Sequence, residues 1–169
     1  MNSQDFEFVS QLLRKRAGIV LTGDKMYLLE SRLAPLARKE GLPSIDDLIH
    51  VIRARRDERL IGQLVDVMTT NETFFFRDKT PFDHLKEAIL PLLGQARQGN
   101  RIRIWCAASS TGQEPYSIAM MLDQNPALTQ GVPVEIVATD ISDRCLERAR
   151  QGLFTQFEVQ RGLPIQMLM

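Results

Sequence analysis

The chain has 169 residues, 44% of them hydrophobic, and its 21 Lys and Arg residues balance 21 Asp and Glu residues. This is the composition of a soluble globular protein, long enough for one ordinary domain or two small ones. The charge balance argues against nucleic acid as a partner, and no segment approaches the ~20 apolar residues of a transmembrane helix or the pattern of a signal peptide. The two cysteines lack the spacing of a metal site or a disulfide framework, so we expect a cytoplasmic protein with no bound metal and no direct membrane insertion.

The first part of the chain has the pattern of an all-helical domain. Apolar residues recur at helical spacing through residues 1–68. Pro35 lies inside the second helical segment and should bend the helix or start it afresh. Ser44 and Asp47 form a Ser-x-x-Asp start signal for a third helix, and a fourth helix follows. We therefore expect a helical N-terminal domain at residues 1–70.

A connecting segment rich in phenylalanine follows the helical domain. The sequence TTNETFFFRDKTPF at residues 69–82 contains Thr, Asn and Asp, which bond their own backbone and disfavour a helix. Its three consecutive phenylalanines cannot lie in solvent and must pack against another part of the protein. Thr80 and Pro81 predict the cap and first position of the next helix, whose last turn Pro91 should bend. We assign residues 71–78 as a linker.

The second half of the chain alternates between strands and helices. Residues 102–105 predict a short buried strand, 114–124 a helix, 134–140 a second strand and 142–152 a second helix. This order is typical of a right-handed βαβ unit with parallel strands. The expected fold class is therefore α/β, with a small all-helical N-terminal domain followed by the start of a Rossmann-like domain at residues 79–169.

Two carboxylates fall where an open α/β sheet binds its ligand, beyond the carboxyl ends of the strands. These are Glu114 and Asp140, and a carboxylate at the end of the second strand can accept both hydroxyls of a ribose. The loop AASSTGQEP has a single glycine, Gly112, and lacks the Gly-rich cradle and the lysine of a phosphate loop. The pattern favours a cationic ligand with adenosine but no phosphate, such as S-adenosylmethionine, whose carboxylate Arg77 would clamp.

Each of these features also has an ordinary structural interpretation. Asp140 could cap the helix that begins near Ser142, and Arg77 could be a solvated linker residue. Trp105, like the phenylalanines, has a residue type that is more often found in a core than stacked on a ligand. The residues by themselves leave both interpretations open.

The chain resembles the CheR family of chemotaxis receptor methyltransferases in three segments, MTTNETFFFRD, RIRIWCAASSTGQEPYSIAM and VEIVATDIS. The family pattern is roughly TTNxTxFFR, then W-x-A-x-x-STGEEPYS, then ATDI, and the resemblance covers essentially the whole chain. It implies a Rossmann-like methyltransferase domain that transfers a methyl group from S-adenosylmethionine, leaving S-adenosylhomocysteine. The acceptors it implies are glutamate side chains of methyl-accepting chemotaxis receptors. The implied cofactor contacts are Asn71, Thr73, Arg77, Glu114 and Asp140.

The chain departs from the family pattern in three ways. Gln113 replaces the usual first Glu of the Glu-Glu pair, and Ser109 stands where many members have Cys. The family also continues well beyond this chain, and its later cofactor motifs are absent here. A two-stranded sheet is marginal by itself. We therefore expect an N-terminal fragment that is inactive alone and that could form a homodimer through exposed strand edges.

The implied chemistry requires no catalytic acid or base, because a glutamate carboxylate with a pKa of ~4.3 is already a nucleophile at neutral pH. The implied receptor target is a glutamate-rich helical bundle. Arg32, Arg38 and Lys39 offer it positive charge, although they could equally form an ordinary solvated face. Two other functions stay open: a non-catalytic module that binds a receptor or another partner, and a methyltransferase for a different substrate.

Overall fold

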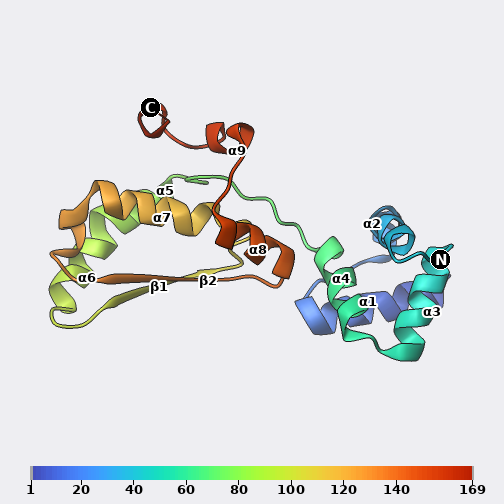
Figure 1. The fold of residues 1–169 in the computed structure, drawn as a ribbon. Helices are drawn as coiled ribbons and strands as arrows, with labels where there is room; N and C mark the ends of the chain where they lie inside the picture. The colour runs from blue at the N-terminus through green and yellow to red at the C-terminus, as the bar shows by residue number, and fades with distance from the viewer. Residues whose placement is uncertain (1, 169) are drawn as a thin grey trace. The chain divides into compact units, whose positions relative to one another are not determined.

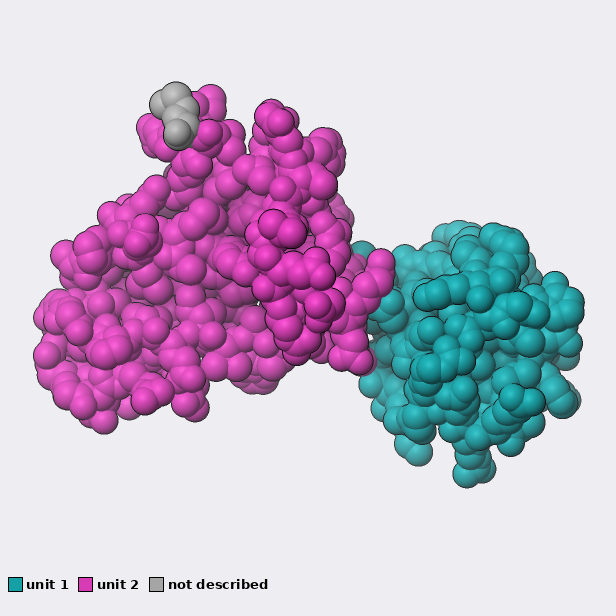
Figure 2. Space-filling view, in the orientation of Figure 1, with its two compact units in different colours: residues 1–70 teal, residues 71–169 magenta. Residues whose placement is uncertain are grey.

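The computed structural model describes residues 2–168 of the chain. The chain divides into two compact units, Met1–Thr70 and Asn71–Met169, which Figure 2 shows in different colours. Each unit buries a hydrophobic cluster of its own. No helix within residues 2–168 is long and apolar enough to cross a membrane.

Unit 1 is all-helical. It comprises α1 (Ser3–Ala17), the 3-10 turn η1 (Gly23–Lys25), α2 (Met26–Lys39), α3 (Ile45–Arg55) and α4 (Glu58–Met68) (Figure 1). Each α-helix turns an apolar stripe inward, as the spacing predicts. The fully buried side chains of this core are Val9, Leu13, Leu29, Leu33, Leu48, Ile49, Ile52 and Leu64.

Local signals account for where these helices begin and end. Gly41 has a φ of 71° and its N–H donates to the carbonyl of Arg38, in a Schellman motif that ends α2. The Ser44 hydroxyl accepts the N–H of Asp47 at 3.1 Å, which confirms the predicted start of α3. The predicted restart at Pro35 is wrong, because α2 runs through this residue as one helix. Pro35 is exposed, so water can solvate the carbonyl one turn earlier that loses its helical partner.

Unit 2 has the predicted α/β pattern. Its elements are α5 (Thr80–His84), the π-helical turn η2 (Leu85–Ile89), α6 (Leu90–Ala96), β1 (Ile102–Ala107), α7 (Gln113–Gln124), the 3-10 turn η3 (Pro126–Thr129), β2 (Val134–Thr139), α8 (Asp143–Gln151), α9 (Gln156–Gln160) and η4 (Ile165–Met167). The strands β1 and β2 pair in parallel, from Ile102 opposite Val134 to Ala107 opposite Thr139. The predicted fold class, a helical domain followed by the start of an α/β domain, is confirmed.

The helix after the linker differs in detail from its prediction. Thr80 is the first helical residue, one position later than a cap, and Lys79 precedes it. The prediction that Pro91 lies in the last turn of this helix is wrong, because α6 runs on to Ala96. The π-helical turn ends at Ile89, and the Leu90 N–H donates to the carbonyl of Leu85. A π turn shifts the hydrogen bonding by one residue, and here it ends two residues before Pro91, which has no N–H to donate.

One face of the sheet is buried and the other is open within the described residues. Cys106 of β1 packs with Ile118 and Met121 of α7, which lies along one face of the sheet in Figure 1. Trp105 points to the opposite face and is 69% exposed, so its predicted place in a core is wrong. The cause is the period-2 alternation of a strand, and the Trp105 indole N–H donates to the Thr139 hydroxyl at 3.0 Å.

Candidate cofactor-binding site

The loop between β1 and α7 has an unusual backbone. Ala108 and Ser110 have φ values of 58° and 50°, and Gly112 has 97°. A Cβ atom at Gly112 would lie 2.9 Å from the Cβ of Ala149 on α8. Glycine is therefore required here both for its left-handed φ and for the close approach of α8. The single glycine of the loop serves packing, which is consistent with a loop that cradles no phosphate.

Asp140 follows β2 and holds this loop in place. One carboxylate oxygen accepts the backbone N–H of Ser110 at 2.7 Å, and the other accepts the N–H of Ser142 at 2.8 Å. Ser142 itself caps α8 by accepting the N–H of Cys145. A carboxylate has about four lone-pair positions, so both Asp140 oxygens retain capacity for a ligand's hydroxyl groups. The Asp140 carboxylate is half-buried and already accepts two backbone hydrogen bonds, so it is preorganised to accept two more from the hydroxyl groups of a ligand.

The phenylalanine-rich linker packs onto unit 2, as its composition predicts. Phe75 is buried, and its ring meets the ring of Phe154 edge-on with centroids 5.0 Å apart. Phe76 lies against Phe82 in the same way at 5.2 Å. The Phe76 N–H donates to the Ser117 hydroxyl of α7 at 3.0 Å. These contacts fix the path of the linker beside the loop that follows β1.

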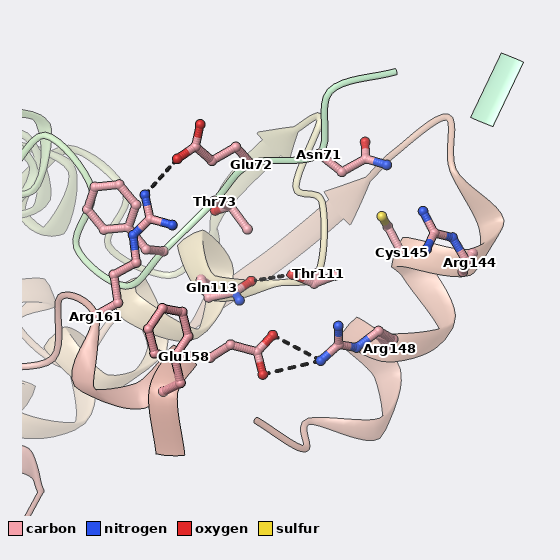
Figure 3. Close-up of a pocket in the computed structure, with 12 residues that line it drawn as sticks. Asn71, Glu72, Thr73, Thr111, Gln113, Arg144, Cys145, Arg148, Glu158 and Arg161 are labelled. Carbon is pink, nitrogen blue, oxygen red and sulfur yellow. Dashed lines mark hydrogen bonds and ion pairs between the residues drawn. The ribbon is translucent and has the colours of Figure 1, made fainter. Parts of the chain in front are cut away.

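A cavity of about 320 Å³ lies between the linker, the β1–α7 loop, α8 and α9 (Figure 3). Its lining includes Asn71 and Thr73 of the linker, Thr111 and Gln113 after β1, and Cys145 of α8. Two of the predicted cofactor contacts therefore come together with the loop that Asp140 holds. Arg77, Glu114 and Asp140 do not line this cavity.

Ion pairs hold the outer wall of the cavity. The Arg161 guanidinium donates to Glu72 at 2.6 Å and lowers the pKa of that carboxyl. Arg148 pairs with Glu158 at 3.0 Å, as Figure 3 shows. Hydrogen bonds from Thr155 are the main cause of the lowered pKa of Glu158, and Arg148 adds to it. The carboxylates of this wall are thus neutralised by neighbouring guanidinium groups.

Comparison with known proteins identifies the family. A model of the CheR methyltransferase SAM binding domain matches residues 71–169, and one of the CheR methyltransferase all-alpha domain matches residues 4–69. The chain belongs to the CheR methyltransferase family. It is 44% identical over 162 residues to chemotaxis protein methyltransferase 1 of Pseudomonas aeruginosa, covering 94% of this chain and 59% of that protein. It is 43% identical over 165 residues to the chemotaxis protein methyltransferase of Vibrio parahaemolyticus, with shares of 96% and 59%.

The Escherichia coli chemotaxis protein methyltransferase is 32% identical over 169 residues, covering 99% of this chain and 56% of that protein. The chain thus spans a little under 60% of the length of the relatives it matches. The SAM-binding match falls on the unit that contains the candidate site, so S-adenosylmethionine is the ligand that the family implies for this unit.

The two other predicted cofactor contacts lie at the edges of this region. Glu114 is exposed on the first turn of α7, close to the Cys106 thiol at the end of β1. Burial raises the pKa of Cys106 to about 12, and Glu114 contributes through its charge and a hydrogen bond. Arg77 is exposed and donates to the carbonyl of Glu72 at 2.7 Å. Their role as cofactor contacts stays a prediction.

The residues of this site fit an adenosyl ligand by their chemistry. Asp140 keeps acceptor capacity for ribose hydroxyls, and Asn71 and Thr73 supply polar groups along the cavity. Ser110 and Ser117 are not among the site residues predicted from the sequence, although both lie within the segment that carries the resemblance. Both serines hydrogen-bond to the linker, which is distant from them in the sequence, so residue spacing could not predict these contacts. Within residues 2–168, no group of three or more His, Cys, Asp or Glu side chains could hold a metal ion.

Proposed function

We propose that the full-length protein carrying this chain methylates glutamate side chains of methyl-accepting chemotaxis receptors with S-adenosylmethionine, in the cytoplasm. The observation that carries this proposal is the Asp140 carboxylate, bonded by two backbone N–H groups at the end of β2. It stands beside a loop whose single glycine serves helix packing rather than a phosphate. Such a carboxylate suits the two hydroxyls of a ribose.

Each part of the chain has its own role in this function. Residues 1–70 dock the receptor, residues 71–78 contribute to the cofactor site, and residues 79–169 form the first part of the methyltransferase domain. Asp140 would accept the ribose hydroxyls and Glu114 would face the cationic part of the ligand. Arg77 would reach the ligand's carboxylate once its side chain leaves the Glu72 carbonyl.

Methyl transfer requires the protein to position the two reactants and to remove water from around the receptor carboxylate, and it requires no proton transfer. S-adenosylmethionine supplies a methyl group on a positively charged sulfur. The receptor glutamate oxygen forms a bond to the methyl carbon as the carbon–sulfur bond breaks, and S-adenosylhomocysteine leaves. Because both charges are neutralised in this step, exclusion of water favours it. The side chains of Asn71, Thr73 and Asp140 hold the donor in place for it.

Receptor docking is proposed for the end of α2. Arg38 and Lys39 are exposed in its last turn. Arg32 is engaged within unit 1, where its guanidinium donates to the carbonyls of Val67, Met68 and Thr69. The exposed cationic groups of α2 that could meet an acidic receptor helix are therefore Arg38 and Lys39 rather than Arg32.

The proposal is tested by calorimetry with S-adenosylhomocysteine and by transfer of a labelled methyl group to receptor, both with the full-length protein. Asp140→Ala should weaken S-adenosylhomocysteine binding by about 1–3 kcal/mol, roughly fivefold or more, because ribose hydroxyls lose their acceptors. Asp143→Ala is the control, since this neighbouring carboxylate is exposed on the first turn of α8. Unchanged affinity in Asp140→Ala would remove Asp140 from the site.

The receptor assay separates the proposed activity from its alternatives. A wild-type protein that binds receptor but transfers no methyl group would be a non-catalytic module. Transfer to another acceptor in place of receptor would make it a methyltransferase for a different substrate. We expect the isolated 169-residue chain to bind S-adenosylhomocysteine more weakly than the full-length protein, since the resemblance implies further cofactor motifs in the remainder of the family's length.

A further inference from the structure

We propose that Ser110 is a positioning residue that couples the linker to the carboxylate of Asp140, an inference that rests on the proposed function. Ser110 is 5% exposed and makes two hydrogen bonds in opposite directions. Its backbone N–H donates to Asp140 at 2.7 Å, and its hydroxyl donates to the backbone carbonyl of Asn71 at 2.8 Å. One residue thus links two predicted cofactor contacts that are distant in the sequence.

The bond to Asn71 fixes the backbone of the linker and not merely one side chain. Because a carbonyl oxygen is held, the directions in which the Asn71 and Thr73 side chains leave the linker are set together. Both side chains line the cavity of Figure 3, as does Thr111, which directly follows Ser110. A shift of the linker relative to the loop would therefore move these polar groups with respect to Asp140.

The backbone conformation of Ser110 is a second, independent indication that its side chain has a role. Its φ of 50° is left-handed, a conformation that glycine adopts without strain and that other residues adopt at a cost. Strained residues of this kind persist where the surroundings over-determine them, and they gather at functional sites. Phe76 and Ala108, with φ of 51° and 58°, show that the strain extends along both the linker and the loop. The hydrogen bond from its hydroxyl to the linker carbonyl explains why a serine, rather than a glycine, occupies this position.

The neighbouring serine provides a natural comparison. Ser109 is also buried, at 2% exposure, but its hydroxyl has no hydrogen-bond partner among the residues the structure describes. The two serines are adjacent and both buried, and they differ in whether the hydroxyl bonds the linker. Ser109→Ala is therefore a control for removing a buried hydroxyl from the same loop.

The test uses the full-length protein with Ser110→Ala, Ser110→Gly and Ser109→Ala. Both Ser110 variants keep the backbone N–H that bonds Asp140, and glycine also accommodates the left-handed φ, so at least Ser110→Gly should fold as the wild type does. We expect both Ser110 variants to raise the KM for S-adenosylmethionine and the Kd for S-adenosylhomocysteine about fivefold or more. The kcat at saturation should stay within about twofold, and Ser109→Ala should change neither constant.

Amide exchange of the linker is measured on the same proteins without cofactor. The peptide covering residues 71–76 should exchange faster in both Ser110 variants and at the wild-type rate in Ser109→Ala. The inference is overturned if the Ser110 variants keep wild-type KM and Kd, if they change only the melting temperature, or if Ser109→Ala weakens binding equally. A wild-type protein that neither binds S-adenosylhomocysteine nor methylates receptor refutes the proposed function itself, and with it the cofactor role of Ser110.

Discussion

Two separate constraints act on Gly112 at the start of α7. Its φ of 97° is left-handed, and a Cβ atom there would meet the Ala149 Cβ at 2.9 Å and the Tyr116 ring at 3.3 Å. Tyr116 in turn donates its hydroxyl proton to the Ala149 carbonyl, so α7 and α8 meet closely at this point. The contact between the two helices sets the position of the loop on which Asp140 acts.

Replacing Gly112 by alanine should therefore destabilise unit 2. We expect Gly112→Ala to lower the free energy of unfolding by about 2 kcal/mol or more, from left-handed strain and steric overlap together. Gly131→Ala is the control, because Gly131 has a similar φ of 82° and no atom of residues 2–168 lies within 4 Å of a Cβ atom there. This variant should lose about 1 kcal/mol. Urea unfolding followed by circular dichroism measures both. Equal losses in the two variants would mean that contact with α8 is unimportant.

The buried Cys106 thiol makes stability depend on alkaline pH. Burial, with Glu114 beside it, raises the pKa of Cys106 from about 9 to about 12. Between these values the unfolded chain releases the thiol proton and the folded chain keeps it, so the free energy of unfolding falls as pH rises. Below about pH 9 both states hold the proton and this effect is absent.

Urea midpoints from pH 8 to pH 10.5 test this for wild type and Cys106→Ala. The wild-type midpoint should fall more steeply with pH, because the variant lacks the thiol while sharing all other titrations. Glu114→Gln should show an intermediate slope, since it removes the contribution of Glu114 to the raised pKa of Cys106 and leaves burial, the largest single cause. Parallel curves for wild type and Cys106→Ala would show that the thiol titrates alike in both states.

At the scale of single elements, α4 ends against a charge from α2. The last carbonyls of a helix lack intrahelical partners and carry the negative end of its dipole. Arg32 fills this place, with its guanidinium 2.8 Å from the carbonyl oxygen of Met68 and 3.2 Å from that of Thr69. A basic residue that the sequence suggests for docking thus joins two helices of unit 1.

We expect Arg32→Met to lower the free energy of unfolding of unit 1 by about 1–2 kcal/mol, because hydrogen bonds from a charged donor are lost. Arg38→Met is the matched control and should leave stability unchanged, since Arg38 is exposed. Receptor methylation by the full-length protein should show the opposite pattern, with the larger effect in Arg38→Met. It should fall in Arg38→Met, and more so at low salt, where charges are least screened. Equal stability of the two variants would contradict the capping role of Arg32.

At the scale of the whole molecule, unit 2 presents apolar surface that its described elements leave uncovered. The open sheet face carries Trp105, and Leu153, Phe157 and Ile165 are each about 75% exposed. Within residues 2–168 each strand has a single neighbouring strand, so each retains an unpaired edge. Exposed apolar surface and unpaired edges favour association with another chain.

We therefore expect the isolated 169-residue chain to self-associate at micromolar concentration. Its mass from light scattering should rise with concentration, and emission from Trp105, the single tryptophan, should shift to the blue as the indole is covered. Trp105→Ala should weaken association, whereas Val20→Ala, which removes an equally exposed side chain from unit 1, should not. A monomer at all concentrations, with solvent-like Trp105 emission, would contradict this expectation.

The sequence by itself determined the features that depend on neighbouring residues. The left-handed Gly41 after α2, the Ser44 cap of α3 and the Ser142 cap of α8 were all predictable, because each signal lies within one helical turn of its effect. The order of strands and helices and the family followed from periodicity and three motifs. The short helix α9 was missed, since its capping box spans only Thr155 to Glu158 and Phe157 is exposed, so no apolar stripe marks it.

Only the tertiary structure decided which groups meet across long stretches of chain. Trp105 lies in solvent because the strand alternation places it on the face that α7 does not cover. Arg32 caps α4, and Ser110 joins Asn71 to Asp140, because folding brings together segments that no sequence spacing relates. A hydrogen bond is decided by distances of a few tenths of an ångström, whereas sequence patterns specify only which face of an element a residue occupies.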